Sequence, residues 1–105
     1  MISFSFRVVR VSKIDSGLSY DLLLDKFEYN KKRKHPFLYI ELNNKLITLT
    51  IESQPRMFRN YNFSSDEEES IIEVKNYVKE NCTVLINNYF GKLSDRKTLE
   101  LLRRK

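Results

Sequence analysis

The first 29 residues alternate between apolar and polar side chains, once over Ile2–Val8 and again over Leu18–Leu24. A period of two is typical of a strand with one buried face. The turn residues Asp15-Ser16-Gly17 separate the two stretches, so we expect an antiparallel hairpin. For residues 18–29 a helix remains the alternative, because apolar side chains there also occur four residues apart.

A second pair of strand-like stretches, residues 37–42 and 45–51, flanks Asn43-Asn44. Asparagine tolerates positive φ, and a two-residue turn of this kind favours a type I′ hairpin. The numbers of two residues that face each other across this hairpin then add up to 87. This register gives the hairpin one apolar face and one mixed face. We expect the mixed face either to be covered or to be available for contact. The predicted pairs are Ile40 with Ile47 and Leu38 with Leu49 on the apolar face, and Phe37 with Thr50 and Tyr39 with Thr48 on the mixed face.

The period changes after Phe63, where Ser64 or Ser65 precedes Glu67 or Glu68 by three residues and can form a capping box. Apolar residues then recur at spacings of three and four, the pattern of one amphipathic helix of about seven turns. Gly91 supplies a left-handed residue at which this helix can end. The apolar stripe of the helix comprises Ile71, Val74, Val78, Cys82, Leu85 and Tyr89.

The C-terminal residues predict a second helix, which Ser94 caps. At about ten residues it is too short to be stable alone in water, so it either docks on the domain or binds a partner. The fold class is therefore α+β, a small antiparallel sheet of two hairpins covered by one long amphipathic helix, plus a short C-terminal helix. We expect residues 1–91 to form a single α+β domain and residues 92–105 to form the short basic helix.

Composition excludes several classes of function. With two glycines the chain carries neither a P-loop nor a dinucleotide-binding glycine run. His35 and Cys82 are its one histidine and one cysteine, whereas a structural zinc site needs about four such ligands. A single histidine also supplies a general acid or a general base, but not both. We therefore predict a non-enzymatic protein without a cofactor or a metal.

The apolar stretches are shorter than those of a signal peptide or a membrane-spanning helix. A lone cysteine fits a reducing compartment. We therefore expect a cytoplasmic protein with no membrane partner. Abundant Lys, Asn and Ile are compatible with an AT-rich coding sequence, as in low-GC bacteria and their phages.

Positive charge is the main functional signal. Lys and Arg number 19 against 14 Asp and Glu, and the surplus lies in residues 1–60, which hold eleven basic and six acidic side chains. Clustered cations bind phosphates independently of sequence, although a charged run is also typical of a solvated loop. Tyr39 beside Phe37 would suit base stacking, although rings in small sheets also serve as core. The candidate nucleic-acid or partner-binding residues are Lys31, Lys32, Arg33, Lys34, His35, Tyr39, Arg56, Arg59, Arg103, Arg104 and Lys105.

The stretch His35-Pro36-Phe37-Leu38-Tyr39-Ile40-Glu41 and the helix from Phe63 through Phe90 resemble an uncharacterised family of small bacterial proteins often encoded near toxin–antitoxin genes. The resemblance covers about half of the chain and implies a hairpin-plus-helix fold. That family's pattern has two histidines about the proline, whereas only His35 stands here. A role for paired histidines in binding metal or phosphate is therefore not carried over.

These observations favour a small basic binding protein that acts on nucleic acid or a nucleoprotein complex, as an accessory or regulatory factor of a bacterium or mobile element. The alternative is a protein–protein interaction module, such as an antitoxin-like, immunity-like or phage-encoded defence inhibitor. The two hypotheses differ in salt dependence, because phosphate binding weakens steeply as salt rises.

Overall fold

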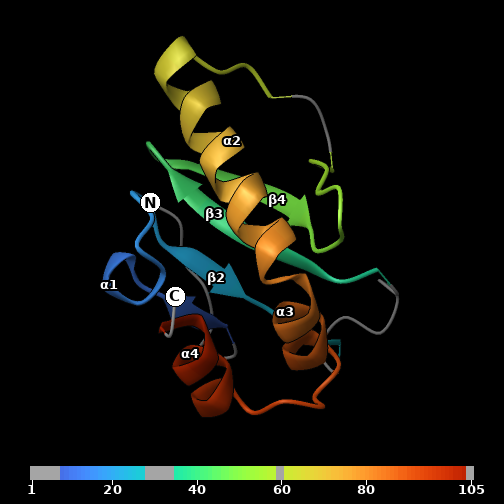
Figure 1. Ribbon diagram of the computed structural model, residues 1–105. Coiled ribbons are helices and arrows are strands. Elements are labelled where there is room, and N and C mark those ends of the chain that lie inside the picture. Colours follow the sequence, from blue (N-terminus) through green and yellow to red (C-terminus); the bar gives the residue numbers. More distant parts are fainter. Residues whose placement is uncertain (1–7, 28–34, 59–60, 104–105) are drawn as a thin grey trace.

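A computed structural model describes residues 8–27, 35–58 and 61–103 and confirms the predicted α+β class. One face of a four-stranded antiparallel sheet is crossed by helices α2 and α3, while α4 lies beside α1 (Figure 1). The strand order is β1-β2-β3-β4, the same as the order in the chain. The elements are β1 (Val9–Val11), α1 (Lys13–Ser16), β2 (Leu22–Leu24), β3 (Phe37–Leu42), β4 (Lys45–Thr50), α2 (Ser65–Glu80), α3 (Cys82–Tyr89) and α4 (Asp95–Arg103).

The first hairpin is present, and residues 22–24 form a strand rather than a helix. β1 pairs antiparallel with β2, placing Val9 opposite Leu24. The turn between them is larger than expected, because the Ser12 hydroxyl accepts the backbone N–H of Asp15 and caps the single helical turn α1. Gly17 ends that turn at φ 77°, a conformation that favours glycine. Residues 1–7, which hold most of the first predicted strand, lie outside the described residues.

The second hairpin has the predicted register, with Ile40 opposite Ile47 and Phe37 opposite Thr50. Asn43 and Asn44 adopt φ values of 47° and 65°, as a type I′ turn requires. The apolar face of this hairpin is buried throughout. On the mixed face Phe37 is also fully buried, so that end of the face is covered.

The predicted long helix is present as α2, but it is shorter than expected, because the structure ends it before Asn81 and continues with the separate helix α3. The buried Asn81 amide donates to the Tyr77 carbonyl oxygen at 2.9 Å, while the Asn81 backbone N–H bonds the same oxygen at 3.0 Å. A side chain that competes for a helical carbonyl bends or interrupts a helix. At the other end of α2 the capping box between Ser64 and Glu67 is formed.

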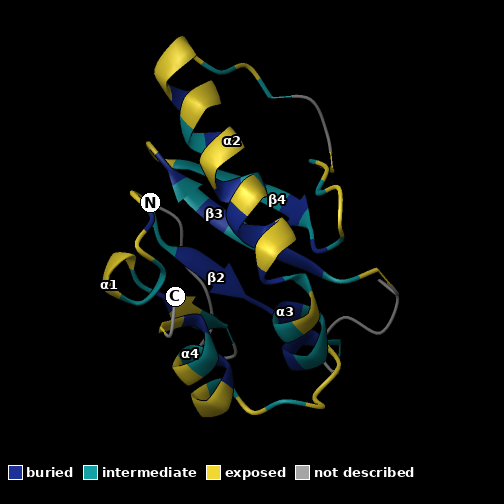
Figure 2. Ribbon diagram, in the orientation of Figure 1, coloured by how far each residue is buried: buried dark blue, intermediate teal, exposed yellow. Residues whose placement is uncertain are grey.

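The core lies between the sheet and α2–α3, and α4 closes one side of it. Figure 2 shows α2 buried on the side toward the sheet and exposed on the other. Leu102 of α4 is 2% exposed and belongs to the same cluster as Leu38 and Val78. Helix α4, which lies within residues 92–105, thus packs against the rest of the domain and contacts α1 and α3.

The outer edge of β4 is covered by the connector, which we define as the described residues 52–58 and 61–63 between β4 and α2. Thr50 N donates to Arg56 O at 2.8 Å, and Phe58 N donates to Thr48 O at 3.1 Å. The Thr48 N–H donates to the Tyr61 hydroxyl oxygen at 3.2 Å. These bonds satisfy strand groups that would otherwise face solvent.

The buried helix face can be tested with a matched pair of substitutions on α2. Val78 is fully buried whereas Ile72 is 58% exposed. Val78→Asp places an unpaired carboxylate in the core and should cost more than ~3 kcal/mol of a total of about 5–15 kcal/mol. Ile72→Asp adds the same charge in water and should change stability little. Urea unfolding followed by circular dichroism measures both, and equal stabilities would contradict this packing.

Glu67 ties the start of α2 to the hairpin turn through three hydrogen bonds to its carboxylate. It accepts from Ser64 N at 3.0 Å, Lys45 Nζ at 2.9 Å and Asn43 Nδ2 at 3.1 Å. These donors, the Ser64 backbone first, lower the pKa of Glu67 from 4.5 to about 2. Because this folded-state pKa lies below the unfolded value, the stabilisation is present above pH 4.5 and is lost as pH falls toward 2.

We therefore expect Glu67→Gln to lower the urea midpoint at neutral pH, with the difference from the wild type shrinking as pH falls from 4.5 toward 2. The control is Glu73→Gln, an exposed carboxylate of the same helix. It should give a small difference at every pH. A Glu67→Gln effect that is constant between neutral and acidic pH would contradict the ionic origin of the stabilisation.

Candidate functional site

Two of the candidate residues, His35 and Arg56, both interact electrostatically with the Glu52 carboxylate. Arg56 Nε is 3.2 Å from Glu52 Oε2, and both side chains are exposed to solvent. The pKa of Glu52 is lowered, first by the Thr50 hydroxyl and then by Arg56, with a contribution from the charge of His35. The Glu52 carboxylate therefore offsets the charge of Arg56.

Arg103 does not join them. It lies on α4, which Figure 1 places across the molecule from the described connector. Its guanidinium pairs with Asp15 of α1 and, as the main cause, lowers the pKa of that carboxyl. The structure therefore assigns Arg103 a contact between α4 and α1. The other candidate cations, Lys31, Lys32, Arg33, Lys34, Arg59, Arg104 and Lys105, lie outside the described residues.

The described part of the chain is not basic. It contains eleven basic and thirteen acidic side chains, a formal charge of −2, whereas the remaining residues contain eight basic and one acidic. At least seven of the eleven cations form ion pairs. The positive surplus of the sequence therefore belongs to residues 1–7, 28–34, 59–60 and 104–105.

Aromatic rings gather where β3 begins and α3 ends. The Phe37 ring lies 5.4 Å from Tyr39, 5.7 Å from Phe58 and 5.5 Å from Tyr89, centroid to centroid. Tyr39 is half-buried, and its hydroxyl donates to Asp25 Oδ2 at 3.2 Å, so its polar end already has a partner. Phe58 is more open to solvent, with 42% of its surface exposed.

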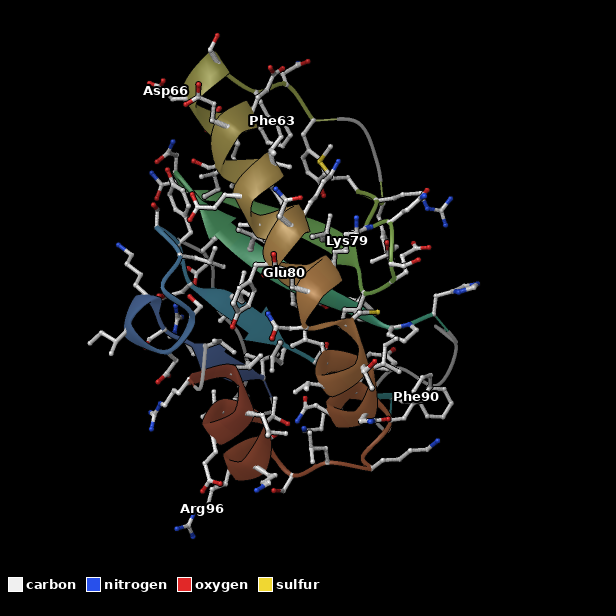
Figure 3. All side chains as sticks on the ribbon, in the orientation of Figure 1. Phe63, Asp66, Lys79, Glu80, Phe90 and Arg96 are labelled. Carbon is white, nitrogen blue, oxygen red and sulfur yellow. The ribbon has the colours of Figure 1, made fainter. Side chains whose placement is uncertain are left out.

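A pocket of about 270 Å³ continues this aromatic cluster at the end of α3, lined by Lys26, Phe27, Tyr89, Phe90 and Gly91. The Phe27 and Phe90 rings are 5.5 Å apart, and Tyr89 and Phe90 are 5.2 Å apart and nearly perpendicular. Tyr89 is buried whereas Phe90 is 38% exposed. Figure 3 shows Phe90 at the outer edge of the molecule. The pocket thus has aromatic walls and an opening to solvent.

Lys26 is the charged residue among the described residues that line the pocket, and Asp95 and Asn88 hold its ammonium group in place. Lys26 Nζ pairs with Asp95 Oδ1 and lies 3.5 Å from Asn88 Oδ1. The buried Asn88 amide donates to Asp95 Oδ1 at 2.8 Å and to Leu93 O at 3.3 Å. The three side chains join the segment after β2, α3 and the start of α4, and the charges of Lys26 and Asp95 cancel.

The sequence predictions did not include Lys26, Phe27, Tyr89 or Phe90 among the site residues. One signal was available, because Tyr89 and Phe90 are adjacent rings before Gly91 and a helix cannot bury both neighbours on one face. The contact with Phe27 had no such signal, since it joins residues more than sixty positions apart. Tertiary structure alone brings these rings together.

The described residues show no arrangement typical of catalysis. Burial raises the pKa of the Cys82 thiol, the opposite of what an activated nucleophile needs. His35 is exposed, and among the described residues no three His, Cys, Asp or Glu side chains are grouped so as to hold a metal ion. Within the same residues, no helix has the length and apolar character needed to cross a membrane.

Comparisons with protein-family models, curated proteins and solved structures gave no match to the chain.

The network around Asn88 can be tested by comparing two adjacent asparagines of α3. Asn88→Ala removes two donated hydrogen bonds from a buried site and should cost ~1–3 kcal/mol. Asn87→Ala, at a half-buried neighbouring position, is the control and should cost less. Urea unfolding at neutral pH gives both values, and a smaller cost for Asn88→Ala than for Asn87→Ala would contradict the structural role of the network.

Proposed function

We propose that this protein is a small, non-enzymatic binding protein that acts on nucleic acid or on a nucleoprotein complex. The run from Lys31 to His35 supplies cations to the phosphates. Arg59 and the C-terminal Arg104 and Lys105 add to this charge where they reach the same ligand. The class of cellular role, an accessory or regulatory factor of a bacterium or mobile element, is part of the same proposal.

The distribution of charge is the observation that supports this proposal. The described residues have a formal charge of −2 and pair most of their cations, so this part of the chain neutralises its own positive charge. The remaining residues have a formal charge of +7, and four of their cations are consecutive, at positions 31–34. Closely spaced cations displace counterions from a polyanion and bind it without reading its sequence.

A protein–protein interaction module is the second candidate, and one observation favours it. Ile14 on α1 is 94% exposed and Ile72 on α2 is 58% exposed. Exposed apolar side chains can anchor a partner, although single ones are also normal on protein surfaces. Binding to an apolar partner surface depends little on salt, which separates this candidate from phosphate binding.

The charge run can be tested by replacing Lys31, Lys32, Arg33 and Lys34 with Ser. We expect weaker binding to nucleic acid and a salt slope that is less steep by roughly 0.7–0.9 for each phosphate that the variant no longer neutralises. Thermal stability should hardly change, because exposed charges contribute little to folding. Binding is measured by fluorescence anisotropy of labelled single-stranded and duplex oligonucleotides over a series of salt concentrations.

The matched control replaces Lys13, Lys75, Lys79 and Lys92 with Ser, which lowers the net charge by the same amount elsewhere on the chain. If both variants lose affinity equally, net charge rather than the run accounts for binding. If the wild-type protein binds neither oligonucleotide at low salt, the nucleic-acid proposal is wrong and the interaction module becomes the better one.

A further inference from the structure

The pocket at the end of α3 has features that select the kind of ligand it can hold. Its volume of about 270 Å³ lies just below the range of about 300–1,000 Å³ for drug-sized ligands. It therefore suits a smaller group. Phe27 and Phe90 line the pocket, and Phe90 is 38% exposed, so a flat aromatic group can stack on it.

The charges around the pocket restrict the ligand further. The pocket lies at the C-terminal end of α3, where the helix dipole carries partial negative charge and disfavours an anion such as phosphate. The charge of Lys26, which lines the pocket, is offset by its ion pair with Asp95, so this side of the pocket attracts neither an anion nor a cation. These groups together favour a neutral, flat ring with polar edges.

We propose that this pocket holds one unpaired nucleobase of a single-stranded nucleic acid, stacked on Phe90. This inference rests on the proposed function and deepens it, since it predicts single strands as the preferred ligand. A neutral heteroaromatic base matches the aromatic walls and the uncharged polar side. A duplex presents its bases already stacked and paired, so it cannot place one in the pocket without unstacking it. Stacking on a ring is tolerant of base identity, so this site adds affinity rather than sequence specificity.

The test compares a base-containing strand with an abasic strand of the same length, and adds an RNA strand and a duplex as further ligands. A labelled oligothymidylate, the corresponding oligouridylate, an abasic oligonucleotide of the same length and a duplex are each titrated with the full chain at low salt. Because stacking of a base is worth about 5- to 150-fold in affinity, oligothymidylate should bind more tightly than the abasic strand by that factor. The oligouridylate arm shows whether DNA or RNA is the better ligand.

Substitutions at two exposed rings locate the base. Phe90→Leu keeps apolar bulk but removes the ring, and it should abolish the advantage of the base-containing strand. Phe90→Tyr keeps the ring and should retain the advantage. Phe58→Leu is the matched control, because Phe58 is also an exposed ring but lies outside the pocket lining. It should leave the advantage unchanged.

A second readout does not depend on the Leu variant folding. The chain has no tryptophan, so Phe90→Trp introduces a single tryptophan at the pocket, whose emission can be excited selectively at a wavelength at which tyrosine absorbs little. Its emission should be quenched by oligothymidylate and not by the abasic strand.

The outcomes separate the two proposals. Equal binding of the base-containing and abasic strands by the wild-type chain overturns the base pocket and leaves phosphate binding in place. An advantage that survives Phe90→Leu, or that Phe58→Leu removes equally, also overturns the base pocket. The base pocket is also overturned if the abasic strand quenches the emission of the Phe90→Trp variant as strongly as oligothymidylate does. Absence of binding to every oligonucleotide overturns both the pocket and the proposed function.

Discussion

Burial of one apolar sheet face beneath α2 and α3 is the interaction on which the other features of this protein depend. The sheet contributes Leu22, Ile40 and Ile47, and the helices contribute Val74, Val78 and Leu85, to one continuous cluster. Each apolar side chain removed from water stabilises the fold by about 1.5–3 kcal/mol. The packed sheet and helices in turn hold β2, β3 and the end of α3 in fixed relation, so the aromatic cluster and its pocket exist only in the folded state.

Local chemistry explains why much of the fold could be predicted from the sequence. Asn43-Asn44 determines the turn geometry, and a two-residue turn leaves one register for β3 and β4. The Ser64–Glu67 capping box likewise marks a helix start within four residues. The break at Asn81 was missed because an asparagine in a helical pattern does not reveal whether its amide bonds solvent or the preceding turn.

The site was harder to predict, for two physical reasons. The number of charged residues could be counted from the sequence, but their ion pairs could not be predicted. Arg56 pairs with Glu52, and Arg103 pairs with Asp15. The pocket depends on contacts between Phe27 and Phe90, and no local pattern encodes the meeting of residues so distant in the chain. The aromatic positions that the sequence did suggest, Phe37 and Tyr39, lie mainly in packed surroundings.

The order of the strands also has a kinetic consequence. Because β1 to β4 follow one another in the sheet as they do in the chain, each pairing closes only a short loop. Proteins whose contacts are mostly local cross their folding barrier faster than those that must first join distant segments. The ion pair between Lys26 and Asp95 instead joins segments that are 69 residues apart. We therefore expect the four-stranded meander to form before these long-range contacts and the pocket.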